Sequence, residues 1–130
     1  MNDRSRIRER YLRDSLPVRL GGLAANLASV RSFSDNPTHR DVVERLLEES
    51  TWFIEWAAPD APIDVQVALV DCQRQLARWR RGWALVWDDP MQRAAIAERA
   101  GIWSLQFLTL SGLLRGHLDT THQPEEKYSA

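Results

Sequence analysis

Histidine, cysteine and acidic side chains are the groups with which helical proteins most often bind metals, and in this sequence they are scattered. The three histidines, His39, His117 and His122, fit no spacing rule for a zinc site, and no Glu stands three residues before any of them. Di-iron helical bundles use that Glu-x-x-His spacing. Cys72 is the only cysteine, which excludes a multi-cysteine zinc site and an internal disulfide. We expect no metal ion and no other cofactor.

Catalytic groups are equally hard to place. The sequence has no Gly-x-Ser-x-Gly motif and no cysteine beside a base that could activate it. The paired acids Glu48–Glu49 and Asp88–Asp89 fall on polar helix faces or at helix ends, where carboxylates are usually solvated. Glu49 is the exception, since it falls within the apolar arc near Trp52 and Trp56. We therefore expect that the protein is not an enzyme.

Basic side chains are the next group with possible chemistry. Lys127 is the single lysine among the 17 cationic residues, and the rest are arginines. The candidate basic patch lies near the N-terminus and consists of Arg4, Arg6, Arg8, Arg10 and Arg13. Such a patch can contact phosphate or anionic lipid, or it can be one solvated face of a helix. The formal net charge of −1 makes nucleic acid an unfavoured partner.

Tryptophan is unusually common, with 6 residues against 2 Tyr and 3 Phe. One alternative function is a pocket for a small, flat apolar ligand lined by Trp79, Trp83, Trp87 and Trp103. Tryptophans at helical spacing are, however, more often part of a hydrophobic core.

These side chains must be positioned by helices, and the clearest one is predicted over residues 62–87. Apolar residues recur there at spacings of three and four, namely Leu69, Cys72, Leu76, Trp79, Trp83 and Val86. This periodicity is typical of a long amphipathic helix. We expect the rest of the chain to be organised around it.

Proline after a capping residue marks the other helix starts, at Ser15–Pro17, Asn36–Pro37 and Asp89–Pro90. We expect helices at about 15–31, 37–57 and 90–115, the last one capped by Gly116, and a short N-terminal helix at about 3–13. No stretch alternates with the period of two that is typical of a strand. The prediction is an all-α, antiparallel, up-down-up-down four-helix bundle. It forms a single domain over residues 1–118, followed by a disordered polar tail at 119–130.

Two apolar features exceed what one core needs. Ile63, Val67 and Val70 form a second apolar line nearly opposite the main seam of the predicted helix at 62–87. Trp52 and Trp56 lie one turn apart at the border of the helix at 37–57. Large apolar side chains on a surface are typical of protein interfaces. We therefore expect these five residues to mediate protein–protein contact, with a homodimer as the first choice and an unidentified protein partner as the alternative.

The segment Leu20-Gly21-Gly22-Leu23-Ala24-Ala25-Asn26-Leu27 resembles the segment that follows the phosphoacceptor in histidine-containing phosphotransfer domains. Those domains are four-helix bundles of about this size. Val18 stands at the position of the acceptor histidine and Gly21 at that of the following lysine. The resemblance implies a docking module that cannot carry phosphate, which is a further alternative function.

The N-terminal residues lack the apolar core of a secretory signal, and no run of eighteen apolar residues occurs. We expect a cytoplasmic protein without a membrane span. Its expected function is non-catalytic protein interaction.

Overall fold

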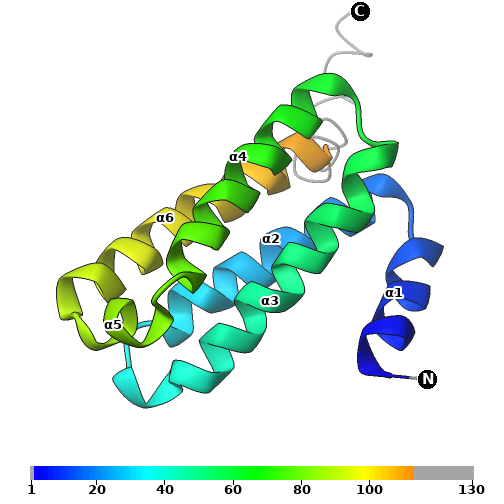
Figure 1. Ribbon diagram of the computed structural model, residues 1–130. Helices are drawn as coiled ribbons and strands as arrows, with labels where there is room; N and C mark the ends of the chain where they lie inside the picture. Colours follow the sequence, from blue (N-terminus) through cyan, green and yellow to red (C-terminus); the bar gives the residue numbers. More distant parts are fainter. Residues whose placement is uncertain (1, 113–130) are drawn as a thin grey trace, which may run out of the picture.

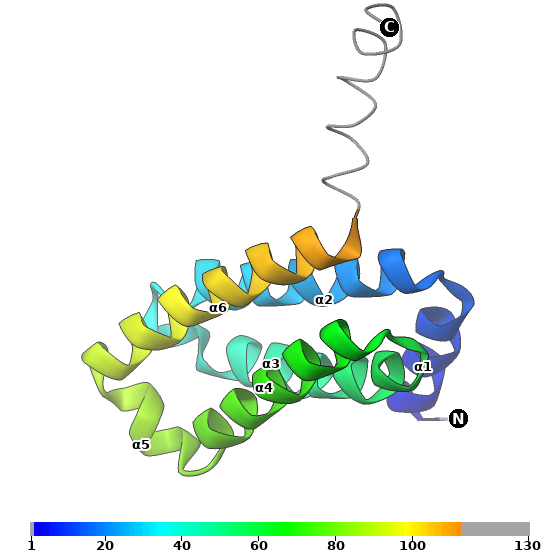
Figure 2. The same ribbon diagram turned by 90° about the horizontal axis from the view of Figure 1, so that it is seen from above.

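The computed structural model describes residues 2–112, which form helices joined by short connections and contain no strand (Figures 1 and 2). This confirms the all-α class. The α-helices are α1 (Asp3–Arg13), α2 (Leu16–Phe33), α3 (Arg40–Ala57), α4 (Ile63–Arg80), α5 (Trp83–Asp88) and α6 (Pro90–Ser111). Two short 3₁₀ helices, η1 (Pro37–His39) and η2 (Ala58–Asp60), precede α3 and α4. The predicted tail at 119–130 lies outside the described residues.

Helix α2 is the element on which the others assemble. It packs along both α6 and α3, and Figure 2 shows α2 and α6 in one layer with α3 and α4 in the other. Because it is covered on two sides, its residues Leu20, Leu23, Leu27 and Val30 are almost completely buried. Ser104 of α6 donates a hydrogen bond to the carbonyl oxygen of Ala24 across 2.7 Å, which ties the two helices together at mid-length.

Two of the three proline-marked helix starts are capped as their residue types predict, whereas the Ser15 side chain makes no capping hydrogen bond at the start of α2. The side chains of Asn36 and Asp89 accept hydrogen bonds from the backbone N–H groups of Thr38 and Met91. A proline follows each of these capping residues, where its missing N–H is not needed for an intrahelical bond. The Asn36 cap thus ends the connection from α2 to η1, and the Asp89 cap ends the connection from α5 to α6.

The single helix predicted over residues 62–87 is wrong, because the chain breaks it at Arg81 and Gly82. Helix α4 ends at Arg80, Gly82 adopts a left-handed conformation with φ of 66°, and α5 begins at Trp83. Glycine adopts positive φ without the steric cost that a Cβ atom imposes. The break redirects the chain so that the Trp87 indole Nε1 reaches the carbonyl oxygen of Pro37 at 2.8 Å.

The predicted end of the last helix is also corrected. Helix α6 ends at Ser111 and is followed by Gly112, whose φ is 78° and whose N–H donates to the Thr109 carbonyl at 3.1 Å. Glycine is therefore the terminating residue type, as expected, but it is Gly112. Gly116 lies outside the described residues.

Candidate functional site

The outward face of α4 carries the second apolar line that the sequence predicts. Ile63, Val67 and Val70 are 73%, 54% and 42% exposed. The opposite face of α4 is buried in the core through Leu69, Cys72 and other residues. Spacings of four and three place the three exposed side chains on one helix face. They form a continuous apolar stripe, here called the α4 stripe.

Charged residues on α4 are segregated along its length. Asp64 and Asp71 lie in the first half and beside the α4 stripe, whereas Arg74 and Arg78 prolong the exposed face toward the C-terminal end. None of these four makes an ion pair with another residue of the described part. The exposed face of α4 is thus acidic and apolar in its first half and basic in its second.

Trp52 and Trp56, the other two predicted interface residues, lie under α1 rather than on an open surface. Trp56 is 8% exposed and Trp52 is half-buried, and their rings stack with centroids 6.1 Å apart. The Arg4 guanidinium lies 5.6 Å and 6.0 Å from the two ring centroids. Arg4 also pairs with Glu55 at 3.1 Å. The two tryptophans are therefore largely covered, whereas the α4 stripe is exposed to solvent.

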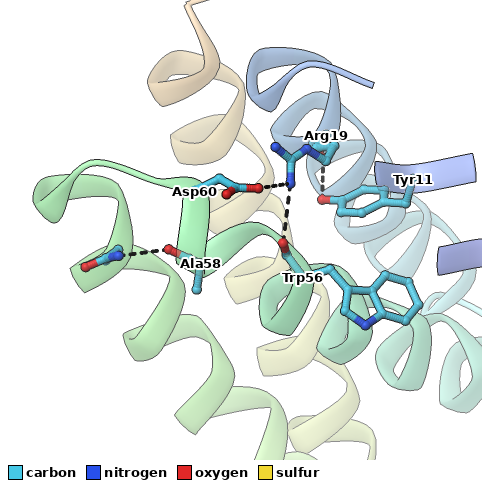
Figure 3. A network of polar contacts seen from close by, with 6 residues as sticks. Tyr11, Arg19, Trp56, Ala58 and Asp60 are labelled. Atoms are coloured by element: carbon cyan, nitrogen blue, oxygen red, sulfur yellow. Dashed lines mark hydrogen bonds and ion pairs between the residues drawn. The ribbon is translucent and has the colours of Figure 1, made fainter. Parts of the chain in front are cut away.

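A polar network fastens α1 to the rest of the molecule (Figure 3). The Tyr11 ring stacks on Phe53 with centroids 4.1 Å apart, and its hydroxyl donates to the Arg19 carbonyl oxygen at 2.7 Å. The Arg19 Nη1 donates to the Trp56 carbonyl oxygen at 3.3 Å and pairs with Asp60 at 3.0 Å. Burial raises the pKa of Tyr11 above its ordinary value, against the opposing effect of the Arg19 charge.

Sequence reasoning missed this network. Tyr11 is spaced four residues from Ile7, which indicated an apolar face for the N-terminal helix but gave no partner for it. Arg19 stands next to Leu20 in an otherwise apolar helix, and its burial follows only from the meeting of α2 with the end of α3.

The N-terminal basic patch lies on α1 and is only partly paired. Arg4 pairs with Glu55, and Arg6 pairs with Asp3 at 2.8 Å. The remaining members are exposed and make no ion pair within residues 2–112, namely Arg8, Arg10 and Arg13.

A groove of about 460 Å³ lies between α1, α2 and α3. Arg10, Val18 and Glu49 are among the residues that line it, and the Glu49 carboxylate accepts a hydrogen bond from Asn26 at 3.2 Å. Val18 is 47% exposed. The position that matches the phosphoacceptor histidine is thus on the surface of α2 and borders this groove.

The four tryptophans of the proposed ligand pocket are core residues. All are at most 9% exposed, and Trp79 also lines a groove of about 280 Å³ between α4 and α6. The Trp83 and Trp87 rings are in contact with their planes tilted by 34°, and the Arg99 guanidinium lies 5.2 Å from the centroid of the Trp103 ring. The indole N–H groups of Trp83 and Trp103 are buried and have no hydrogen-bond partner within residues 2–112.

Metal-binding and nucleophilic groups are not assembled in the described part of the chain. No cluster of His, Cys, Asp and Glu there is suited to hold a metal ion. Cys72 is fully buried, and this burial raises the pKa of its thiol to about 12. His39 contacts the Phe33 carbonyl and ring, whereas His117 and His122 lie outside the described residues.

Comparison with protein-family models, with curated proteins and with solved structures finds no match to this chain. Among residues 2–112, no helix has both the length and the apolar character needed to cross a bilayer.

Proposed function

We propose that this protein is a non-catalytic interaction module that forms a homodimer through the α4 stripe. The observation that carries the proposal is the exposure of Ile63, Val67 and Val70 on one face of a helix whose other face is in the core. Large aliphatic side chains in a contiguous row lose contact with water when a second surface covers them, which favours association.

The charge distribution of α4 fits a second copy of the same helix. In a two-fold, antiparallel pairing centred on Val67, Val67 meets its own copy and Ile63 lies beside Val70 of the second copy. The same operator places Arg74 one helical turn beyond Asp64 of the second copy, at the acidic end of that helix, and each contact occurs twice. Because the acidic and basic halves are complementary, this face is suited to self-association.

We infer in addition that the four long helices form an antiparallel up-down-up-down bundle. The short connections and the packing of α2 against both α3 and α6 support this topology. In such a bundle each helix keeps one face toward solvent. The α4 stripe occupies that solvent-facing position on α4.

Sedimentation velocity over a concentration series tests the dimer. We expect Val67→Asp to weaken dimerisation by about tenfold or more, because the two-fold axis sets the new charge against its own copy. The matched control is Leu105→Asp, since Leu105 is 61% exposed on α6. The control is expected to dimerise like the wild type.

Charge exchange gives an independent check. Asp64→Arg is expected to weaken the dimer, and combining it with Arg74→Asp is expected to restore it. A wild-type protein that remains monomeric at high micromolar concentration contradicts the proposal. Native mass spectrometry of the same samples also reports any retained small molecule, which is the outcome expected for a tryptophan-lined ligand site.

Docking of another protein at the Val18 groove is the second candidate. The exposure of Val18 beside this groove favours it. This function predicts a one-to-one complex that Val18→Asp weakens and Val67→Asp does not, measured by titration calorimetry with the partner.

A further inference from the structure

Helix α6 carries apolar side chains on its outward face as well as on its core face. Ile96 and Trp103 are among its buried residues, whereas Leu105 is 61% exposed and Ile102 is 46% exposed. Spacings of three and four place a row of outward residues on one side of the helix. This row is called the α6 strip and consists of Met91, Ala94, Ala95, Glu98, Gly101, Ile102 and Leu105. A helix that is apolar on two opposite faces is usually covered on both.

A groove of about 670 Å³ along α6 shows that members of the α6 strip share one surface. The groove runs between α6 and the end of α2, and the strip residues that line it are Ala94, Glu98, Gly101, Ile102 and Leu105. The Arg31 side chain lies so close over Gly101 that a Cβ atom there would be 2.8 Å from the Arg31 Cδ. Glu98 and Ile102 also line the groove between α4 and α6, so they are accessible from both sides.

The charged residues that line the larger groove are Arg31, Asp35 and Glu98. None of the three makes an ion pair within residues 2–112. The two carboxylates outnumber the one guanidinium, so this groove is weakly acidic as well as apolar.

The segment that directly follows α6 has matching chemistry. Residues 113–118 lie outside the described residues, and their sequence is Leu113-Leu114-Arg115-Gly116-His117-Leu118. The segment contains three leucines, one arginine and no acidic residue. Leucine side chains leave water when they contact an exposed aliphatic surface, and a basic segment is attracted to an acidic groove.

The length of this segment is sufficient for it to return along α6. Gly112 ends the helix with a φ of 78°, a left-handed conformation that turns the chain away from the helix axis. Ile102 lies about 15 Å from Gly112 along the helix. The six residues from Gly112 to Leu118 span up to about 20 Å when they are extended, which leaves some length for the reversal.

We propose that residues 113–118 fold back over the α6 strip of their own chain, with Leu118 against Ile102 and Leu105. The segment then covers the larger groove. The competing surface is the α4 stripe, because Figure 1 shows the start of α4 at the same end of the molecule as the end of α6. This proposal does not rest on the α4 dimer, since α6 and α4 expose different faces.

Disulfide trapping in the full chain tests which surface the segment covers. In a Cys72→Ala background, Ile102→Cys/Leu118→Cys treated with oxidised glutathione is expected to form a disulfide within one chain. The rate is expected to exceed that of Ile63→Cys/Leu118→Cys by about tenfold or more, because docking raises the effective concentration of one thiol at the other. Non-reducing electrophoresis separates this product from disulfide-linked dimers. Equal rates for the two pairs, or a product joined between two chains, overturn the proposal.

A double-mutant cycle gives a second readout that needs no cross-link. Ile102→Ser and Leu118→Ser are each expected to lower the midpoint of urea denaturation. The double variant is expected to have a midpoint close to that of the more affected single variant, because either substitution removes the same contact. The matched control combines Leu118→Ser with Leu85→Ser, since Leu85 is 79% exposed on α5, and these effects are expected to add. Additive effects of Ile102→Ser and Leu118→Ser, or no effect of Leu118→Ser, contradict the proposal.

Discussion

The positively charged side chain of Arg19 is buried away from water, and nearby oxygen atoms accept hydrogen bonds from it. Its side chain is 8% exposed, and Nη1 bonds the Trp56 carbonyl oxygen and the Asp60 carboxylate. Its Nε is buried and has no partner within residues 2–112. The Arg19 backbone carbonyl in turn accepts from Tyr11. One residue thus connects α1, α2 and the end of α3.

We expect Tyr11→Phe to lower the free energy of unfolding by about 1 kcal/mol. The Arg19 carbonyl oxygen then loses the hydrogen bond from the Tyr11 hydroxyl, while the stacking of the ring on Phe53 remains. Urea denaturation measures the change. The control Thr109→Val removes an exposed hydroxyl bond within α6 and is expected to cost less. Equal effects of both variants contradict a special role of the Tyr11 hydroxyl.

We expect the protein to become less stable at alkaline pH because the Cys72 thiol is buried. Burial raises its pKa from 9.0 to about 12, so the unfolded chain releases the thiol proton at lower pH than the folded protein does. The stabilising contribution is complete below the unfolded pKa of 9.0 and is lost as pH rises toward 12. The loss is at most about 1.4 kcal/mol per pH unit.

Urea denaturation from pH 7 to 11 measures this loss, and Cys72→Ala is expected to show a shallower decline than the wild type. Tyr11, whose pKa is also raised by burial, contributes to the decline in both proteins. Identical pH profiles would contradict the assignment to Cys72.

At the scale of elements, the break between α4 and α5 depends on Gly82. A Cβ atom there would meet nothing within 4 Å, so the cost of a substitution comes from the backbone, which has φ of 66°. We expect Gly82→Ala to destabilise the protein by about 1 kcal/mol, measured by thermal or urea unfolding.

Gly22 is the matched control, because it lies inside α2 at negative φ. A Cβ atom at Gly22 would meet Tyr11 Cε1 at 3.7 Å, which is ordinary contact. Gly22→Ala is therefore expected to stabilise the protein by about 0.5–1 kcal/mol. If both substitutions shift stability in the same direction, the conformational argument fails.

At the scale of the whole molecule, α1 covers part of the surface of α3. It is an arginine-rich helix with a single buried residue, Tyr11, and it lies over the aromatic residues of α3. An isolated helix of 11 residues is marginal in water, so its order depends on this docking.

We expect Tyr11→Asp to release α1 while α2 to α6 remain folded, since a charge cannot stay stacked on Phe53 without a partner. Exposure of Trp52 and Trp56 is expected to shift tryptophan fluorescence to longer wavelength, with most of the helical circular dichroism retained. Arg4→Gln, which removes only surface contacts, serves as the control with little shift. Loss of all helical signal in Tyr11→Asp contradicts the view of α1 as a separable cover.

The sequence by itself determined the helical class, most helix starts and the position of the α4 stripe. These follow from local physics: the 3.6-residue period, capping by Asn36 and Asp89, and an apolar row at Ile63, Val67 and Val70 that cannot share the core face. The period alone did not reveal the α4–α5 break, because Trp79 and Trp83 keep helical spacing across Gly82.

Only the tertiary structure decided which surfaces stay open. Trp52 and Trp56 are covered because Tyr11 stacks on Phe53 and Arg4 reaches Glu55, contacts between residues more than forty positions apart. The burial of Arg19 likewise depends on Trp56 and Asp60 of a distant turn. Apolar residues that recur along one helix face predict that this face is covered. Which element covers it depends on packing between segments that are distant in the sequence, and local periodicity carries no information about that packing.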